Sequence, residues 1–448
     1  MREPGAICLV SCYELGHAPA GIAMPLAFLE RAGFAPSVLD LAVEKLDEQR
    51  IGRARLVAIS VPMHTALRLG LRLLDRLAAV ERPPVVVFHG LYAQLNRSLL
   101  LERGAAAVLA GEGEAALVRL VEALDRGDAP RSPAEPALLK LEFPVPQHGP
   151  LPPLSRYGKL DLGGEQRLAA YTEASRGCRH TCRHCPVTPV YRGRFFVVPR
   201  EVVLEDVERQ LARGARHVTF GDPDFWNGPG HAEAIVRELH RRHPEVTYDA
   251  TIKVEHLLGQ RQRLSTLAAT GCAFVTTAVE SLSDRVLDRL AKGHTARDVE
   301  TAFDLADAAG LPLRPTFVAF TPWTTAADFA EMLAFVRRRD LVEVVEPVQY
   351  TLRLLVPPGS ALLEIAIPGL GELRGETLSY AWRHPDERMD ALQQRLRGVA
   401  EAAGPDRHET FARVCRETEA LLGLPPPQPP RHRRRRNHVP SLTESWFC

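Results

Sequence analysis

The chain has 448 residues, of which 45% are hydrophobic and 25% charged, and its formal net charge is +1. This composition is that of a globular protein of two or three domains, and the near-neutral charge excludes a strong overall attraction to nucleic acid or to a membrane surface. The sequence has no apolar run of about 18 residues and no signal-peptide pattern, so we expect a cytoplasmic protein without a membrane partner. The eight cysteines show no disulfide framework, which suits a reducing compartment.

The first third of the chain alternates short apolar runs with segments of helical periodicity. We expect strands at residues 6–10, 38–41, 56–61, 85–88 and 107–109. The helices between them include residues 19–32, 64–80 and 114–124. This alternation predicts a parallel sheet covered on both faces, with ligands at the carboxyl ends of its strands. We therefore predict an α/β, Rossmann-like domain over residues 1–130, followed by a Pro-, Arg- and Ala-rich linker over residues 131–165.

Strand and helix patterns alternate again over residues 166–374. Strands are expected at residues 168–174, 217–220, 246–251, 273–279, 313–320 and 347–354. The expected helices are residues 199–213, 230–242, 255–269, 284–290 with 296–309, and 325–338. Six such units are too few for a closed eight-unit barrel.

The C-terminal part has a different character. Residues 389–402 and 409–422 have long helical patterns, and we predict a small helical cap over residues 375–424. Residues 425–430 are rich in proline and residues 431–436 carry five arginines. A chain that lacks backbone donors and repels itself does not pack, so we predict a flexible tail over residues 425–448.

The most informative stretch is a loop that carries three thiols at the spacing CxxxCxxC, directly after the expected strand at residues 168–174. These are Cys178, Cys182 and Cys185. A loop can aim three sulfurs at one point, and thiolates suit zinc or an iron–sulfur cluster. Three interpretations remain open: a [4Fe–4S] cluster with one iron free of protein ligands, a zinc ion whose shell is completed by His180 or His184, or thiols without a metal.

This loop resembles the cluster loop of the radical S-adenosylmethionine (radical SAM) enzymes, although many members carry an aromatic residue where His184 stands. The first domain resembles the cobalamin-binding-like domain that precedes many radical SAM cores, on residues 19–23, 58–61, 89–93 and 111–114. The cobalt-ligating pattern Asp-x-His-x-x-Gly is absent, and the nearest histidine is His17. The resemblance implies a partial (β/α)6 barrel of TIM type, a [4Fe–4S] cluster and S-adenosylmethionine as cosubstrate, and leaves cobalamin binding open.

Polar residues follow several barrel strands, where sites of such folds lie. Gly221 and Asp222 follow the second strand, Lys253 the third, and Glu280 and Ser281 the fourth. A glycine permits close backbone approach, and an acid can accept hydrogen bonds from an amino group. The resemblance implies that the acid at the end of the fourth strand contacts S-adenosylmethionine, and we expect all five residues to bind the cosubstrate. Asp222 can also be a helix-start residue without a ligand.

The last residues, 441–448, carry two aromatic side chains and end at Cys448, which indicates a tail that docks. They resemble the end of a radical SAM group with a Cys-Cys-Ala-Glu-Pro or Cys-Sec-Ala-Glu-Pro tail. We hypothesise that the sequence stops at a selenocysteine codon, and we expect Cys448 to be catalytic. Sequencing past the codon for Cys448 tests this, because the hypothesis requires an in-frame Ala-Glu-Pro.

We therefore expect an enzyme that cleaves S-adenosylmethionine reductively and starts radical chemistry on a small molecule, with organoarsenical biosynthesis as one example. In the family, the usual product is a 5′-deoxyadenosyl radical. An electron donor such as flavodoxin or ferredoxin would be its partner, and nucleic acid is not an expected partner. The alternatives are a radical SAM enzyme that modifies RNA or a peptide, and a zinc-stabilised binding protein without catalysis.

Overall fold

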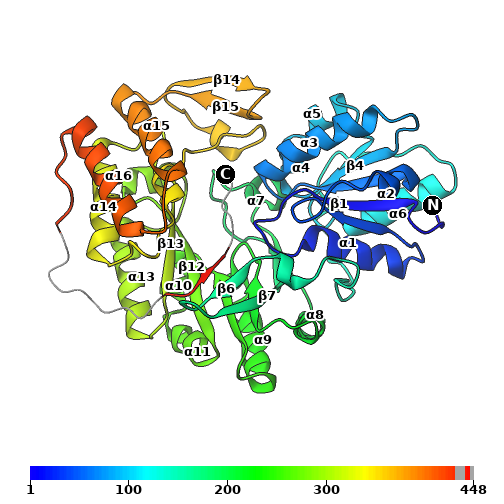
Figure 1. Cartoon of the computed structure of the whole chain (residues 1–448), viewed down its shortest axis with the longest axis horizontal. Coiled ribbons are helices and arrows are strands. Elements are labelled where there is room, and N and C mark those ends of the chain that lie inside the picture. Colours follow the sequence, from blue (N-terminus) through cyan, green and yellow to red (C-terminus); the bar gives the residue numbers. More distant parts are fainter. Residues whose placement is uncertain (429–438, 444–448) are drawn as a thin grey trace.

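The computed structural model describes residues 1–428 and 439–443. Two sheets with their helices lie side by side (Figure 1). The first sheet has five parallel strands in the order β2-β1-β3-β4-β5. Its strands are β1 (Ile7–Ser11), β2 (Ser37–Asp40), β3 (Leu56–Ser60), β4 (Val85–His89) and β5 (Ala107–Leu109).

Helices cover both faces of this sheet. They are α1 (Ala20–Arg31), α2 (Glu48–Arg53), α3 (His64–Ala78), α4 (Leu91–Leu95), α5 (Arg97–Glu102) and α6 (Glu114–Asp125). Successive strand residues point to opposite faces, so Val10 and Ile59 lie in one core cluster while Leu9 and Ala58 lie in another. The predicted Rossmann-like arrangement of a parallel sheet between two helical layers is confirmed.

The second sheet has seven strands in the order β13-β12-β11-β10-β7-β6-β16. They are β6 (Lys159–Asp161), β7 (Gln166–Thr172), β10 (His217–Phe220), β11 (Thr247–Thr251), β12 (Cys272–Glu280), β13 (Leu313–Phe317) and β16 (Ser441–Leu442). Strands β7 and β10 to β13 run parallel, and β6 and β16 are antiparallel additions at one edge. The sheet curls without closing, so the expected partial barrel is confirmed.

Helices follow the parallel strands of this half-barrel. They are α8 (Arg200–Ala212), α9 (Pro229–Arg242), α10 (Val254–Gly259), α11 (Leu264–Ala269), α12 (Asp284–Arg289), α13 (Ala296–Ala308) and α14 (Ala326–Arg338). Both α13 and α14 begin with a capping box, in which Thr295 and Thr325 accept from the helix backbone. The single helix expected over residues 255–269 is divided, because the 3-10 turn η3 (Arg261–Arg263) separates α10 from α11.

The prediction of a sixth full strand over residues 347–354 is wrong. Residues Pro347–Tyr350 form a 3-10 helix, η4, and the only strand-like pairing there is an isolated bridge between Phe320 and Arg353. Proline has no N–H for a strand ladder. The Gln349 side chain instead accepts a hydrogen bond from the backbone N–H of Phe317 over 2.7 Å. A side-chain oxygen thus accepts a hydrogen bond from a backbone N–H of β13, the strand on which the sixth strand was expected to pair.

The C-terminal cap contains the two expected helices, α15 (Glu387–Glu401) and α16 (Arg407–Leu422). The sequence did not reveal the hairpin of β14 (Leu370–Arg374) and β15 (Ser379–Trp382), or the short turn η5 (Ala361–Glu364). Within the predicted flexible tail, residues 441–442 form β16 on the edge strand β6, and Arg314 donates to the Pro440 carbonyl over 3.0 Å. This part of the tail docks, whereas the two aromatic residues and the terminal cysteine that predict docking lie outside the described residues.

The expected linker is also partly built into the second sheet, since residues 159–161 form β6 and Leu154 to Arg156 form the 3-10 turn η1. The domain boundaries at residues 130, 165, 374 and 424 stay predictions. Across residues 1–428 and 439–443, no helix combines the length and the apolar character needed to cross a bilayer.

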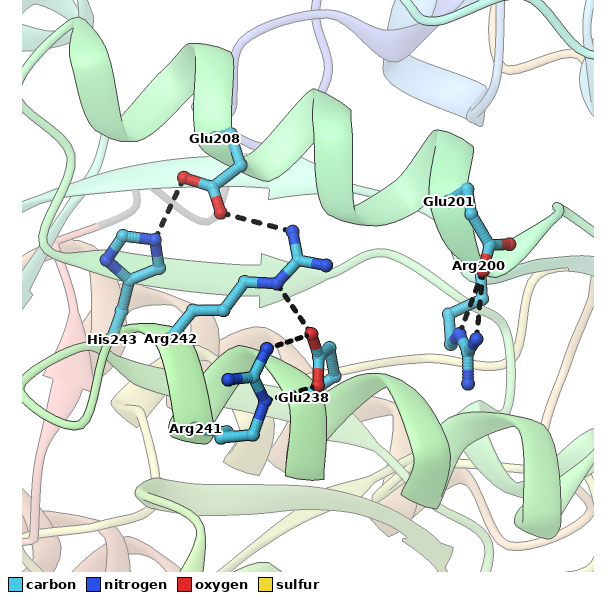
Figure 2. Close-up of polar contacts among 7 residues, drawn as sticks. All are labelled: Arg200, Glu201, Glu208, Glu238, Arg241, Arg242 and His243. Carbon is cyan, nitrogen blue, oxygen red and sulfur yellow. Dashed lines mark hydrogen bonds and ion pairs between the residues drawn. The ribbon is translucent and has the colours of Figure 1, made fainter.

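Helices α8 and α9 are joined on the outer surface by a network of ion pairs (Figure 2). Arg242 contacts both Glu208, at 3.4 Å, and Glu238, at 2.7 Å. His243 lies 2.8 Å from Glu208, and Arg241 donates to Glu238. These pairs are partly or largely exposed and screened by salt, so they contribute little to the stability of the barrel.

Candidate active site

The cysteine loop is held between two short antiparallel strands, β8 (Ser175–Gly177) and β9 (Phe195–Val197), and contains the helix α7 (Val187–Tyr191). Gly177 has φ +75°, and a Cβ there would lie 2.4 Å from the Tyr191 ring and 2.6 Å from the Arg194 carbonyl oxygen. Only glycine fits this position. The backbone N–H of Cys178 then donates to the Arg194 carbonyl over 3.1 Å, which closes the base of the loop.

Asn227 anchors the start of the loop from the next strand connection. Its amide nitrogen donates to the Gly177 carbonyl and its amide oxygen accepts from the Arg179 N–H, each over 3.1 Å. Thr188 donates to the carbonyl of Cys182 over 2.8 Å. The sequence analysis did not identify Asn227. Its position shortly after the barrel strand β10 is the one feature of the sequence that could have indicated a role.

The three sulfurs lie in a buried, positively charged setting. Burial raises the pKa of Cys178 to about 12 and that of Cys185 to about 11. These thiols would therefore stay protonated near neutral pH until a metal displaces the protons. The ammonium of Lys253 lies 3.5 Å from the Cys182 sulfur. Soft donors from one loop beside a buried cation fit an anionic iron–sulfur cluster.

Glu280 stands at the end of β12, where the pairing with β13 shifts register, and it has φ +64°. Its Oε1 lies 3.2 Å from His184 Nε2 and accepts a hydrogen bond from the Lys292 ammonium over 3.3 Å. Burial alone would raise the pKa of Glu280, but Lys292 and His184 outweigh burial and lower it to about 2. The positive φ and the lowered pKa make Glu280 a candidate functional residue.

Asp222 and Gly221 contact the neighbouring strand. Asp222 accepts from the Ala174 N–H over 2.8 Å and from the Ser175 hydroxyl over 2.6 Å, so both its oxygens are engaged. Burial raises the pKa of Asp222 to about 7. A Cβ on Gly221 would lie 2.0 Å from the Tyr171 hydroxyl oxygen, which explains the glycine.

The remaining candidates lie at the same edge of the sheet. Lys253 precedes α10 and is buried, and its ammonium also donates to Glu255 over 3.4 Å. The Ser281 hydroxyl accepts from the Ser283 N–H over 3.1 Å. The structure thus brings Lys253 and Glu280 to the cysteine loop. Asp222 instead contacts Ala174 and Ser175 of the neighbouring chain segment, and Ser281 contacts its own local backbone. Cys448 lies outside the described residues, as do residues 431–436.

The two sheets meet at the cysteine loop through buried charges. Arg176, which precedes the loop, contacts Glu114 at 2.5 Å and Glu112 at 3.5 Å, both from the segment after β5. The Tyr191 hydroxyl donates to Glu112 over 2.9 Å. Burial raises the pKa of Glu112 to about 7, although Arg176 opposes this shift. The first sheet therefore contacts the loop directly.

Two acids lie at the carboxyl ends of β1 and β2, the partly buried Glu14 and the buried Asp40. Burial raises the pKa of Glu14 to about 8 and that of Asp40 to about 6. Glu14 accepts from the Ser60 hydroxyl over 3.1 Å, and Asp40 accepts from the Tyr157 hydroxyl over 2.9 Å. Carboxyl groups and hydroxyls can form hydrogen bonds with the amide groups of a corrin. The centroid of the His17 ring lies 4.7 Å from that of the Tyr171 ring.

Comparison with known families decides the class of this chain. Residues 7–121 match the B12 binding domain, and residues 172–336 match the radical SAM superfamily. The chain carries a B12-binding domain followed by a radical SAM domain. The radical SAM family implies a [4Fe–4S] cluster and S-adenosylmethionine, and the B12-binding domain agrees with cobalamin as a further cofactor.

Several known proteins are similar to the chain. The ribosomal protein uS12 methylthiotransferase RimO of Cereibacter sphaeroides is 28% identical over 190 residues, which cover 40% of this chain and 41% of that protein. An uncharacterized methyltransferase of Pyrococcus horikoshii is 25% identical over 278 residues, covering 58% of each chain. The chain thus matches only about two-fifths to three-fifths of the length of these relatives.

Solved structures share the fold. The cobalamin-dependent S-adenosylmethionine radical enzyme OxsB superposes with a TM-score of 0.68 at 16% identity, over 91% of this chain and 70% of that chain. The radical S-adenosylmethionine methyltransferase TsrM from Kitasatospora setae superposes with a TM-score of 0.57 at 19% identity, over 73% and 72% of the two chains. At such identities the likeness concerns the fold.

Proposed function

We propose that Cys178, Cys182 and Cys185 bind a [4Fe–4S] cluster, and that the protein uses it to cleave S-adenosylmethionine and start radical chemistry on a small molecule. When bound, the cluster supplies the electron that breaks a carbon–sulfur bond of the sulfonium. The observation that carries the proposal is the set of three thiols on one loop, two of them buried, with the Lys253 ammonium only 3.5 Å from the Cys182 sulfur.

Buried cations prepare this site for an anionic group. Lys253 and Lys292 are 6% and 2% exposed, so little water screens their charge. Burial opposes the charge on Lys292, but Glu280 and the neighbouring cysteines outweigh it and raise its pKa. Lys292 therefore stays charged and offsets part of the negative charge that three thiolates bring into the interior.

Glu280 is our principal candidate for orienting the cosubstrate. Its carboxylate stays ionised, and it can accept a hydrogen bond from the ammonium of S-adenosylmethionine. The contacts with Lys292 and His184 hold the Glu280 side chain in place before the ligand binds, which reduces the entropy lost on binding. Gly221, Asp222 and Ser281 stay candidates on sequence grounds, with Asp222 and Ser281 acting through the backbone that they hold.

The substrate and the partners are proposals as well. The relatives are named as methyltransferases and methylthiotransferases, which supports transfer of a small group, and organoarsenical-type chemistry is one instance. Flavodoxin or ferredoxin in the cytoplasm is the proposed electron donor. Matches to both a radical SAM and a B12-binding domain do not favour a zinc-stabilised protein without catalysis, and RNA or peptide modification is likewise not favoured.

Anaerobic reconstitution with iron and sulfide tests this proposal. We expect the wild-type chain to bind about four irons and, once reduced, to cleave S-adenosylmethionine. The nucleoside product, identified by mass spectrometry, reports which carbon–sulfur bond breaks. The Cys182→Ala variant should lose most of the iron and all of the cleavage.

The matched control is Cys415→Ala, which removes another buried thiol, in α16. This variant should keep the iron content and the cleavage rate of the wild type. A wild-type chain that takes up zinc in place of iron under these conditions, or a Cys182→Ala variant that still cleaves the cosubstrate, would contradict the proposal.

A further inference from the structure

Two imidazoles and a buried carboxylate converge beside the cysteine loop. His180 belongs to the loop, Asp224 follows β10, and His256 lies in α10. The Nε2 atoms of His180 and His256 lie 3.2 Å apart, and His256 Nδ1 lies 2.8 Å from Asp224 Oδ2. One ligand atom from each residue lies within 4.8 Å of the others. Three separate elements thus contribute to one cluster.

The protein does not satisfy this cluster by itself. The Asp224 side chain is 0% exposed, and its Oδ1 accepts from the Trp226 N–H over 3.0 Å. Asp224 Oδ2 and His256 Nδ1 are close, yet neither atom makes an aligned hydrogen bond. The nearby Lys253 ammonium contacts Cys182 and Glu255 instead. A buried carboxylate oxygen without a donor is costly, and a bound cation removes that cost.

The arrangement of the two rings points to the same ligand. The ring nitrogens beside the unsatisfied oxygen Asp224 Oδ2 are His256 Nδ1, at 2.8 Å, and His180 Nε2, at 3.7 Å. The other nitrogen of His180, Nδ1, lies 3.4 Å from Glu255, which can hold a proton there and leave the Nε2 lone pair free to bind. Two ligand atoms on one tetrahedral metal ion lie roughly 3.3 Å apart, given metal–ligand bonds of about 2.0–2.1 Å.

We propose that His180, Asp224 and His256 bind one divalent transition-metal ion at a site separate from the iron–sulfur cluster. Two imidazoles and one carboxylate suit Fe²⁺, Co²⁺ or Zn²⁺. The ion ties the cysteine loop to the segments after β10 and β11. Three protein ligands leave coordination positions open to water or to an oxygen or nitrogen of a substrate. This inference goes beyond the proposed function, since it concerns a different set of ligands.

The test is a Co²⁺ titration of the full chain, followed by its visible absorption and by the metal content after gel filtration. With the cluster reconstituted, we expect one equivalent of Co²⁺ in addition to the cluster iron. His256→Ala and His256→Gln should each weaken Co²⁺ binding by more than about tenfold. The glutamine variant, with an unchanged circular dichroism spectrum, separates loss of a ligand from loss of folding. His408→Ala, at an exposed histidine, is the control and should bind as the wild type does.

A second variant keeps this test independent of the cluster. Cys182→Ser should lose the cluster, yet it should still bind one Co²⁺ with weak bands typical of nitrogen and oxygen ligands. Strong thiolate charge-transfer bands in the wild type that disappear in Cys182→Ser would assign the metal to the cysteines and overturn the proposal. Equal Co²⁺ binding by wild type and His256→Ala, or no additional Co²⁺, would also overturn it and favour a simple hydrogen bond between the rings.

Discussion

At the scale of single residues, the site depends on charges that are paired before any ligand binds. Glu280 is the clearest case, because a carboxylate in this degree of burial would take up a proton without Lys292 and His184. The same pairing makes each partner dependent on the other. Removing one charge leaves the other buried and uncompensated, which costs more than the pair contributes.

The Glu280→Gln variant should lower the free energy of unfolding by about 3 kcal/mol near pH 7, since it strands the Lys292 ammonium. Because the folded-state pKa of Glu280 is lowered to about 2, its contribution is complete above the ordinary pKa of 4.5 and is lost as the pH falls toward 2. Urea denaturation at several pH values measures both effects, and the difference between variant and wild type should shrink in acid.

A double variant provides the control for this pair. Glu280→Gln combined with Lys292→Met removes both charges, and it should recover part of the lost stability. A double variant less stable than Glu280→Gln alone would show that Lys292 stabilises the fold through contacts other than Glu280.

At the scale of elements, the cysteine loop is shaped by the short β8–β9 pair and by one glycine. Gly177 needs a left-handed backbone and has no space for a Cβ against Tyr191 and Arg194. The thiols follow it in the chain, so their direction depends on this turn. The loop is therefore a rigid element, in which backbone geometry determines where the sulfurs point.

We expect Gly177→Ala to destabilise the protein by about 2 kcal/mol and to lower its iron content after reconstitution, because the added Cβ forces the loop apart. Thermal unfolding and iron analysis measure the two effects. Gly230→Ala, in α9, is the matched control, since a Cβ there meets nothing within 4 Å. Full iron content in Gly177→Ala would mean that the loop adapts to the side chain.

At the scale of the whole molecule, the carboxyl ends of the two sheets face the same cysteine loop. Arg176 joins them, because it precedes the loop and pairs with Glu112 and Glu114 from the first sheet. The cluster of Leu95, Ala110, Cys178, Val190 and Tyr191 adds an apolar contact at the same place. The B12-binding domain thus contacts the segment that carries the cysteines directly, through both charged and apolar side chains.

Arg176→Met should remove the ion pairs that join the radical SAM domain to the B12-binding domain. It leaves two buried acids without a cation, and we expect a loss of about 3 kcal/mol near pH 7. Hydrogen exchange should increase together in residues 107–125 and 178–194, since both segments lose the same partner. Arg192→Met, whose pair with Glu135 is exposed, is the control and should change neither segment. Faster exchange in only one of the segments would contradict a shared contact.

The local pattern of the chain determined much of this structure. Alternating apolar runs predicted the parallel strands of both sheets, because a buried strand must be apolar wherever it lies. Three thiols within eight residues predicted a metal loop, since neighbours in sequence are also neighbours in space. The prediction of a sixth strand was wrong because Pro347 has no N–H for a ladder and the Gln349 side chain accepts the hydrogen bond that a strand carbonyl would have accepted. The donor of that hydrogen bond is Phe317, which is distant in sequence.

Only the tertiary structure decided which polar residues meet. Lys292 and His184 reach Glu280 from different elements, and His256 and Asp224 approach His180 from two others. Asp222 looks in sequence like any acid after a strand, but its carboxylate accepts a hydrogen bond from the backbone N–H of Ala174, which follows the neighbouring strand β7. Such pairings join residues far apart in the chain, and their distances follow from how the strands lie beside one another. Sequence spacing therefore determined the thiol loop, while packing determined the charges around it.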